Sequence, residues 1–153
     1  MSSELPRTGR LAAIDYGTVR LGVAITDPDQ RLASPLENYT RRGEAADAEW
    51  LTDLVRAERI VGIVVGLPIH ISGDESQKSR EARKFGQWVQ ERTGLPVALF
   101  DERYTSAQAE SLLLEAELTK KRRKQRLDKL AAQILLAAYL ESSRANEKPM
   151  PLD

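Results

Sequence analysis

The sequence predicts an α/β domain built on a mixed five-stranded sheet, and two observations support that fold class. Two apolar runs, 11–14 and 21–25, flank a short polar joint, which is the pattern of a β-hairpin. Two later apolar runs, 60–65 and 97–100, each follow a helical pattern, and strands joined through helices are parallel. A hairpin followed by such crossovers places the 11–14 strand near the centre of the sheet, with helices on both faces.

Local features explain the strands one by one. The 11–14 run is too apolar for a half-exposed strand, so we expect it inside a sheet that is covered on both faces. In the hairpin turn, Gly17 can supply a backbone position with positive φ. A third strand over 31–39 is predicted at the periphery, because Pro35 has no N–H to donate to a neighbouring strand.

Helical spacing of apolar residues and capping signals predict the helices. The first covers 44–58 and has an acidic start, which suits the positive end of a helix dipole. The second runs from about 74 to 92, and a third starts at the capping box 105–108. The last helix covers 127–142. The basic segment 119–126 before it has no apolar anchors, so we expect a connector that is mobile without substrate.

Composition limits the class of protein. The chain has 153 residues, 41% hydrophobic and 30% charged, which suits one globular domain. It has no cysteine, which excludes disulfides and thiolate zinc sites. No apolar run approaches the ~20 residues that span a bilayer, and no signal-peptide core is seen, so we expect a cytoplasmic protein without membrane contact. We expect a flexible arm at 1–9, one domain over 10–144 and a frayed tail at 145–153.

Acidic residues stand at the ends of predicted strands. Asp15 ends the first strand, Asp101 and Glu102 end the last one, and Asp128 opens the last helix. Sites in open α/β sheets form beyond the carboxyl ends of the strands, so the strand-end acids should share one edge. Two structural explanations stay open: Asp15 as an ordinary turn residue, and Asp128 as a charge favoured at a helix N-terminus.

Such a rim of carboxylates is electrostatically unfavourable without a cation, and hard oxygen ligands suit Mg²⁺ or Mn²⁺. Two such ions about 4 Å apart can activate a water and stabilise the leaving oxygen in phosphodiester cleavage. The net charge is zero, so nucleic-acid binding must come from local basic clusters. The candidates are Arg20 and Arg103 beside the rim and the run Lys120, Lys121, Arg122, Arg123, Lys124 and Arg126. Such runs usually only solvate a surface, but this one adjoins a candidate metal ligand.

Four short motifs occur together in the chain, at 15–24, at 65–68 with the following 72–73, at 101–106 and at 128–132. With these motifs in this order, the sequence resembles the YqgF/RuvX family, described as Holliday-junction-resolvase-like proteins or pre-16S rRNA nucleases. The resemblance covers roughly residues 10–141. It implies a ribonuclease H-like fold and metal-dependent nuclease chemistry.

Within the resemblance, Asp15, Glu102 and Asp128 match the acidic centre and would be both catalytic residues and ligands of Mg²⁺ or Mn²⁺. Asp101 is an alternative ligand. The 60–65 strand runs into Gly66-Leu67-Pro68, whereas many ribonuclease H-like nucleases carry an acid there. The acid would therefore come from the neighbouring strand.

The expected function is hydrolysis of nucleic-acid phosphodiesters in 5′-end processing of pre-16S rRNA, with cleavage of four-way DNA junctions as the alternative. The segment 15–18 also resembles the first phosphate loop of actin-like proteins and sugar kinases, so a non-catalytic module that binds nucleic acid or nucleotide phosphates is a weaker alternative. The expected partner is structured RNA or branched DNA, recognised by shape, because no aromatic-rich strand offers a stacking platform. The expected state is a monomer or a weak homodimer.

Overall fold

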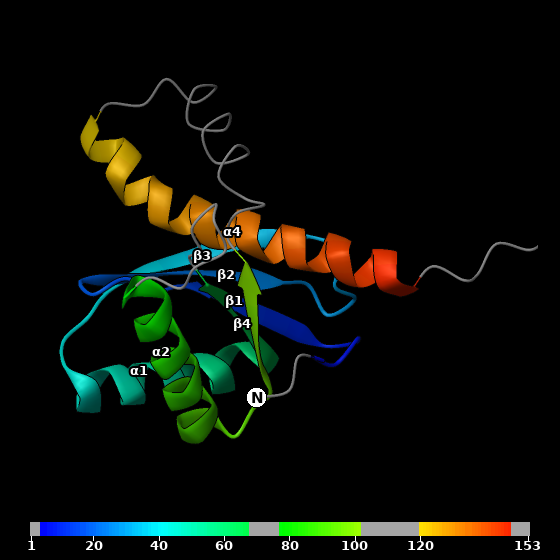
Figure 1. Cartoon of the computed structure of the whole chain (residues 1–153), viewed down its shortest axis with the longest axis horizontal. Coiled ribbons are helices and arrows are strands. Elements are labelled where there is room, and N and C mark those ends of the chain that lie inside the picture. The colour runs from blue at the N-terminus through cyan, green and yellow to red at the C-terminus, as the bar shows by residue number, and fades with distance from the viewer. Residues whose placement is uncertain (1–3, 68–76, 102–119, 148–153) are drawn as a thin grey trace, which may run out of the picture.

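A computed structural model of the chain describes residues 4–67, 77–101 and 120–147. Figure 1 shows a sheet with two helices below it and one long helix above it. The elements are β1 Arg10–Asp15, β2 Arg20–Thr26, β3 Ala33–Thr40, α1 Glu44–Glu58, β4 Ile60–Leu67, α2 Gln77–Thr93, β5 Val97–Asp101 and α4 Lys120–Glu147. No helix within these residues is both long and apolar enough to cross a membrane.

The five strands form one sheet in the order β3-β2-β1-β4-β5. The pairs β1–β2 and β2–β3 are antiparallel, whereas β1–β4 and β4–β5 are parallel. β1 is the middle strand of the sheet. The predicted mixed five-stranded sheet with a central first strand is therefore confirmed, and β3 lies at the edge, as Pro35 indicated.

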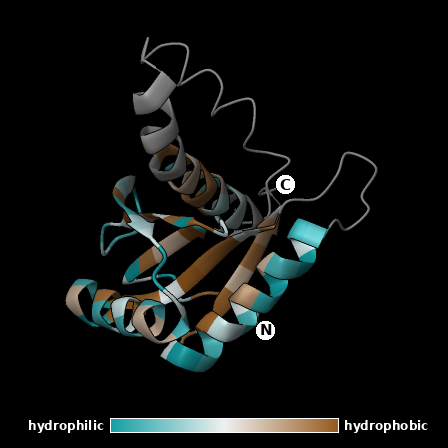
Figure 2. Cartoon of the chain, turned by 90° about the vertical axis from the view of Figure 1, so that its left-hand side faces the viewer, coloured by the Kyte–Doolittle hydropathy of each residue, from teal (hydrophilic) through white to brown (hydrophobic). Residues whose placement is uncertain are grey.

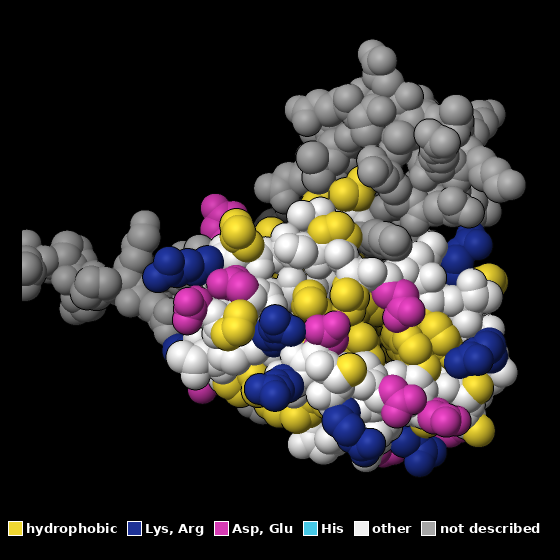
Figure 3. Space-filling view, turned by 180° about the vertical axis from the view of Figure 1, so that it is seen from behind, with side chains coloured by type: hydrophobic (Ala, Val, Ile, Leu, Met, Phe, Trp, Pro, Cys, Tyr) yellow, Lys and Arg dark blue, Asp and Glu magenta, His cyan; other side chains and the backbone are white. Residues whose placement is uncertain are grey.

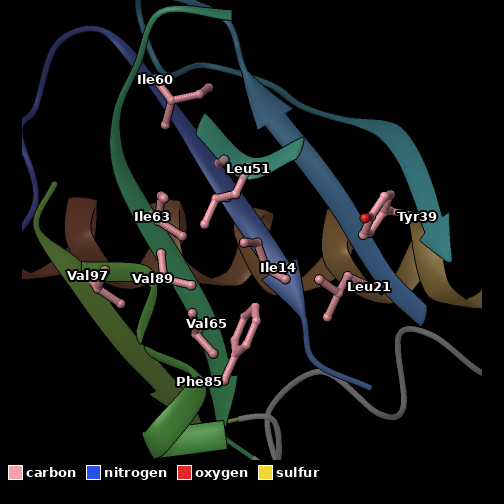
Figure 4. Close-up of a cluster of buried hydrophobic side chains, with 11 residues drawn as sticks. Ile14, Leu21, Tyr39, Leu51, Ile60, Ile63, Val65, Phe85, Val89 and Val97 are labelled. Atoms are coloured by element: carbon pink, nitrogen blue, oxygen red, sulfur yellow. The ribbon is translucent and has the colours of Figure 1, made fainter. Parts of the chain in front are cut away.

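β1 is buried on both faces because its side chains alternate between two core clusters. Ala12 and Ile14 face the cluster beneath α1 and α2, whereas Leu11 and Ala13 face the cluster beneath α4. Figure 4 shows the first cluster, in which Leu51 of α1 and Phe85 of α2 reach the strands. Figure 2 shows the hydrophobic strands between the two helical layers and hydrophilic turns on the outer sides of α1 and α2. This two-sided burial explains the uninterrupted apolar run at 11–14.

The last helix differs from its prediction. α4 begins at Lys120, so residues 120–126 form helical turns, and the prediction that the last helix begins only at 127, after a basic connector, is wrong. The mobility of this segment without substrate stays a prediction. Lys, Arg and Gln are good helix formers, and the start of α4, yellow in Figure 1, extends past the sheet, where a helix needs no apolar stripe. α4 also continues to Glu147, into the predicted tail. The helix predicted from 105–108 lies outside the described residues.

The segment before β1 is packed against the domain. Leu5 is 8% exposed and belongs to the core cluster beneath α4. The side-chain amide of Gln30 donates to the carbonyl oxygens of Pro6 and Gly9, each at 2.9 Å. Residues 4–9 of the predicted arm are therefore anchored through one apolar side chain and two hydrogen bonds.

A buried carboxylate joins the end of β3 to the first turn of α1. Asp47 is 1% exposed, and it accepts hydrogen bonds from the Tyr39 hydroxyl at 2.7 Å and the Arg42 backbone N–H at 2.9 Å. The Arg41 guanidinium donates to its second oxygen at 3.1 Å. Tyr39 in turn stacks on Trp50 of α1 with ring centroids 3.9 Å apart. Asp47 thereby satisfies three donors at the point where the chain leaves the sheet.

Burial disfavours the charged form of Asp47, but the hydrogen bonds from Arg42, Tyr39 and Arg41 outweigh burial and hold the pKa of Asp47 below its usual value. A depressed pKa in the folded state means that ionised Asp47 stabilises the fold above the unfolded-state pKa of about 3.9. That contribution disappears as the pH falls from about 3.9 through the lower pKa of the folded state.

We predict that Asp47→Asn lowers the free energy of unfolding at pH 7 by about 2 kcal/mol, because one charged acceptor in a buried network becomes neutral and its amide faces a guanidinium. The variant should also lose the part of the acid-induced destabilisation that Asp47 causes. Urea unfolding at pH 7 and at steps between pH 5 and pH 2 measures both effects.

The matched control is Asp53→Asn, an exposed carboxylate on the same helix. It should change the free energy of unfolding by less than about 0.5 kcal/mol. Equal stability of the Asp47 and Asp53 variants at pH 7 would contradict a structural role for the Asp47 network.

Candidate active site

The candidate site lies at the edge of the sheet where three parallel strands end. Asp15 is the last residue of β1, is half-buried, and pairs with Gly22 of β2. On the other side of β1, Ile14 pairs with Val65 of β4, and Leu67 of β4 pairs with Asp101 of β5. Strands lie about 4.8 Å apart, so the backbones at the ends of β1 and β5 are about 10 Å apart. The predicted shared edge of these strand ends is therefore present.

The other predicted acids are less fully described. Asp101 ends β5, and Asp128 lies within α4, each placed here by its backbone alone. Glu102 and Arg103 lie outside the described residues. Among the residues that are described, no group of three or more His, Cys, Asp or Glu side chains could hold a metal ion. Convergence of Asp15, Glu102 and Asp128 on a metal therefore stays a prediction.

Asp128 does not open its helix, because α4 begins at Lys120. The prediction that Asp128 is the first residue of that helix is wrong, and the helix dipole no longer explains a charge at this position, since its influence fades within the first turn. Position 128 precedes the buried residues Ala132 and Leu135 by one and two helical turns, on the same side of α4. That side packs against the sheet.

Arg20 is the first residue of β2 and pairs with Thr40 of β3. It lies two residues before Gly22, the partner of Asp15, and therefore at the same edge. Arg20 therefore begins β2 at the edge where β1 ends, and its contact with nucleic acid stays a prediction. The basic run predicted to bind nucleic acid, at 120–124 and 126, lies in the helical start of α4.

Gly17 is required in the turn after Asp15, but not for the predicted reason. Its φ is not positive; in the described chain, the glycines with positive φ are Gly9, Gly43 and Gly94. A Cβ at Gly17 would instead lie 2.5 Å from the Arg20 carbonyl oxygen. The turn folds back so tightly that only glycine leaves room for that carbonyl.

Arg41 holds this turn from the end of β3. Its backbone N–H donates to the Val19 carbonyl at 2.9 Å, and its guanidinium donates to the Gly17 carbonyl at 3.3 Å. The guanidinium also lies 5.6 Å from the centre of the Tyr16 ring and 5.9 Å from that of Phe85. Sequence reasoning missed Arg41, because its partners in this turn, Gly17 and Val19, are more than twenty residues away along the chain.

The electrostatics of Arg41 favour a permanent cation. Partial burial opposes its charge, but hydrogen bonds to Asp47 and Tyr16 raise the pKa of Arg41 above its usual value. Because Arg41 also binds buried Asp47, the turn after Asp15 is connected to α1, and through Phe85 to α2. A rigid turn fixes the direction in which the preceding carboxylate leaves the strand.

The acidic residues at the ends of β1 and β5 suit a hard cation. A half-buried carboxylate ends the central strand, and a second acidic position ends β5 at the same edge. Carboxylate oxygens are the ligands that Mg²⁺ and Mn²⁺ prefer. The donor chemistry is therefore consistent with metal-assisted hydrolysis of a phosphodiester.

Comparisons with known proteins agree with this geometry. The chain matches the family model described as "RuvX: Holliday junction resolvase" over residues 9–142. It is 54% identical over 139 residues to a protein of Rhodopirellula baltica, covering 91% of this chain and 80% of the relative. It is 38% identical to a protein of Koribacter versatilis, covering 94% of each chain. Both relatives are named "Putative pre-16S rRNA nuclease".

Solved structures show the same fold at low sequence identity. Thermus thermophilus RuvC in complex with a Holliday junction substrate is 15% identical, with a TM-score of 0.57 over 88% of this chain and 96% of that one. The fowlpox virus resolvase bound to Holliday junction DNA is 11% identical, with a TM-score of 0.54 over 88% and 98%. The sheet with Asp15 at the end of its central strand is thus a RuvC-like, ribonuclease H-type fold, and the chain belongs to the RuvX family of resolvase-like nucleases.

Proposed function

We propose that this chain is a divalent-metal-dependent nuclease that acts in 5′-end processing of pre-16S rRNA. The observation that carries the proposal is Asp15, which ends the buried central strand at the edge where β5 also ends in an acid. The cytoplasmic location predicted from the sequence belongs to this proposal.

The proposed ligands are Asp15, Glu102 and Asp128, with Asp101 as the alternative to Glu102. When bound there, Mg²⁺ or Mn²⁺ would lower the pKa of a water molecule and stabilise the charge on the leaving oxygen. The chain's own part is to orient these carboxylates. Arg41 supports that orientation, because it holds the turn that follows Asp15 through the carbonyl oxygens of Gly17 and Val19.

The choice of RNA rests on two considerations. Relatives that are 54% and 38% identical to this chain over the aligned residues are named "Putative pre-16S rRNA nuclease". One protomer also offers one proposed acidic centre, so symmetric cleavage of a four-way junction would need a dimer, whereas cleavage of an RNA leader would not. The description of the matching family keeps the DNA junction as the second candidate substrate.

We predict that Asp15→Asn reduces the cleavage rate of a pre-16S rRNA leader at least about 100-fold in Mg²⁺ or Mn²⁺, because it removes a ligand charge and keeps the side-chain shape. The melting temperature should stay close to that of the parent. Rates are measured on labelled RNA and on a labelled four-way DNA junction, each with the metal and with EDTA.

The matched control is Asp29→Asn, an exposed aspartate in the turn between β2 and β3, which should leave the rate unchanged. Full activity of the Asp15 variant would reject the proposed centre. Paired symmetric cuts in the junction, with no cleavage of RNA, would replace the RNA proposal by the DNA one. Binding without cleavage of either substrate would favour the non-catalytic module.

The basic start of α4 is the second part of the proposal. We predict that replacing Lys121, Arg122 and Arg123 together by Ala weakens binding of single-stranded RNA. The slope of log K against log salt should become shallower by about 2, because fewer counterions are released. Ala preserves the helix. A salt dependence equal to that of the parent would show that these residues only solvate the surface.

A further inference from the structure

The two helices on one face of the sheet have opposite charge. α1 contains the acids Glu44, Asp47, Glu49, Asp53 and Glu58 and a single basic residue, Arg56. The first half of α2 contains Lys78, Arg80, Arg83 and Lys84 and a single acid, Glu81. The net charge of the chain is zero, so this separation is local. Figure 3, by contrast, shows a face on which basic and acidic side chains are interspersed.

Three of these basic residues, Arg80, Arg83 and Lys84, lie on the outer side of α2. Ala82, Phe85 and Val89 are buried against the sheet, whereas the four basic residues are exposed. Arg80, Arg83 and Lys84 are spaced by three and four residues, so they share one face of the helix. We call Arg80, Arg83 and Lys84 the α2 basic face. Lys78 is also exposed, but it lies in line with Ala82, Phe85 and Val89 and is not part of this face.

This face lies close to the candidate active site. Phe85, which directly follows Lys84, contacts Tyr16 with ring centroids 4.9 Å apart. Tyr16 directly follows Asp15. Figure 4 shows the Phe85 ring beside Val65, near the ends of β1 and β4. The outer side of α2 is therefore within about one helix diameter, 10–12 Å, of the turn after Asp15.

We propose that the α2 basic face binds the phosphate backbone of the nucleic acid that occupies the active-site edge. This proposal rests on the proposed function for the identity of its partner, and it adds a surface that the basic start of α4 does not provide. α2 and α4 cover opposite faces of the sheet. A nucleic acid across the edge would then be contacted from both faces, through phosphates and independently of base sequence.

The test measures binding rather than cleavage. Asp15→Asn serves as the parent, with EDTA present, and log K is followed against log salt for a single-stranded RNA and a B-form DNA duplex. Adding Arg80→Ala and Lys84→Ala should reduce the slope by about 1.4 for RNA and about 1.8 for the duplex, since two phosphate contacts are lost. With equal affinity at 1 M salt, affinity at 0.1 M salt should fall about 25-fold for the RNA and about 60-fold for the duplex.

The matched control removes the same charge elsewhere. Arg56→Ala with Arg92→Ala removes two exposed cations from the last turns of α1 and α2; Arg92 pairs with Glu44, the first residue of α1, at 3.2 Å. This pair of substitutions should leave the slope at the parent value. A slope for the Arg80 and Lys84 variant that equals the parent's, or an equal loss in the control, would overturn the proposal.

The outcome separates this inference from the proposed function. If the unsubstituted protein cuts no nucleic acid while the α2 variant shows the smaller slope, the nuclease proposal fails and the α2 surface stands. If the protein cuts RNA and the slope does not change, the α2 surface is rejected and the nuclease proposal stands. If the Asp15→Asn parent binds neither the RNA nor the duplex, the α2 surface is rejected.

Discussion

The site depends on one constraint, which is that β1 is buried on both faces and ends in a carboxylate. Leu11 and Ala13 pack beneath α4, and Ala12 and Ile14 pack beneath α1 and α2. A strand held in this way from both sides cannot shift its register by one residue without bringing the charge of Arg10 or Asp15 into a position that an apolar side chain occupies. Asp15 is therefore fixed at one point of the sheet edge.

The turn after Asp15 extends this rigidity beyond the sheet. Arg41 binds two of its carbonyl oxygens, and buried Asp47 holds the guanidinium of Arg41. Phe85 connects α2 to this turn through its ring contact with Tyr16. The hydrophobic core, the ion pair and the candidate active site are thus one connected set of interactions. A substitution at Asp47 should consequently be felt at Asp15, although Asp47 belongs to the fold.

The sequence predicted those parts of the protein that local patterns determine. The first helix, 44–58, was predicted with the bounds that α1 has, because its acidic start and its apolar spacing are both local. The start of α4 was missed, since good helix formers without an apolar stripe give no periodic signal. Gly17 and Arg41 were misread or missed, because a close approach and a contact between distant residues exist only in the folded chain. The α2 basic face likewise becomes visible only when the buried side of α2 is known.

The central claim is that carboxylates from β1, from the chain just after β5 and from α4 hold a divalent cation together. Crystals grown with Mn²⁺ and measured at the manganese absorption edge test it most directly. We predict an anomalous peak about 2.1 Å from an Asp15 oxygen, with Glu102 or Asp101 and Asp128 as further ligands. Manganese bound elsewhere, or bound without Asp15, would contradict the account.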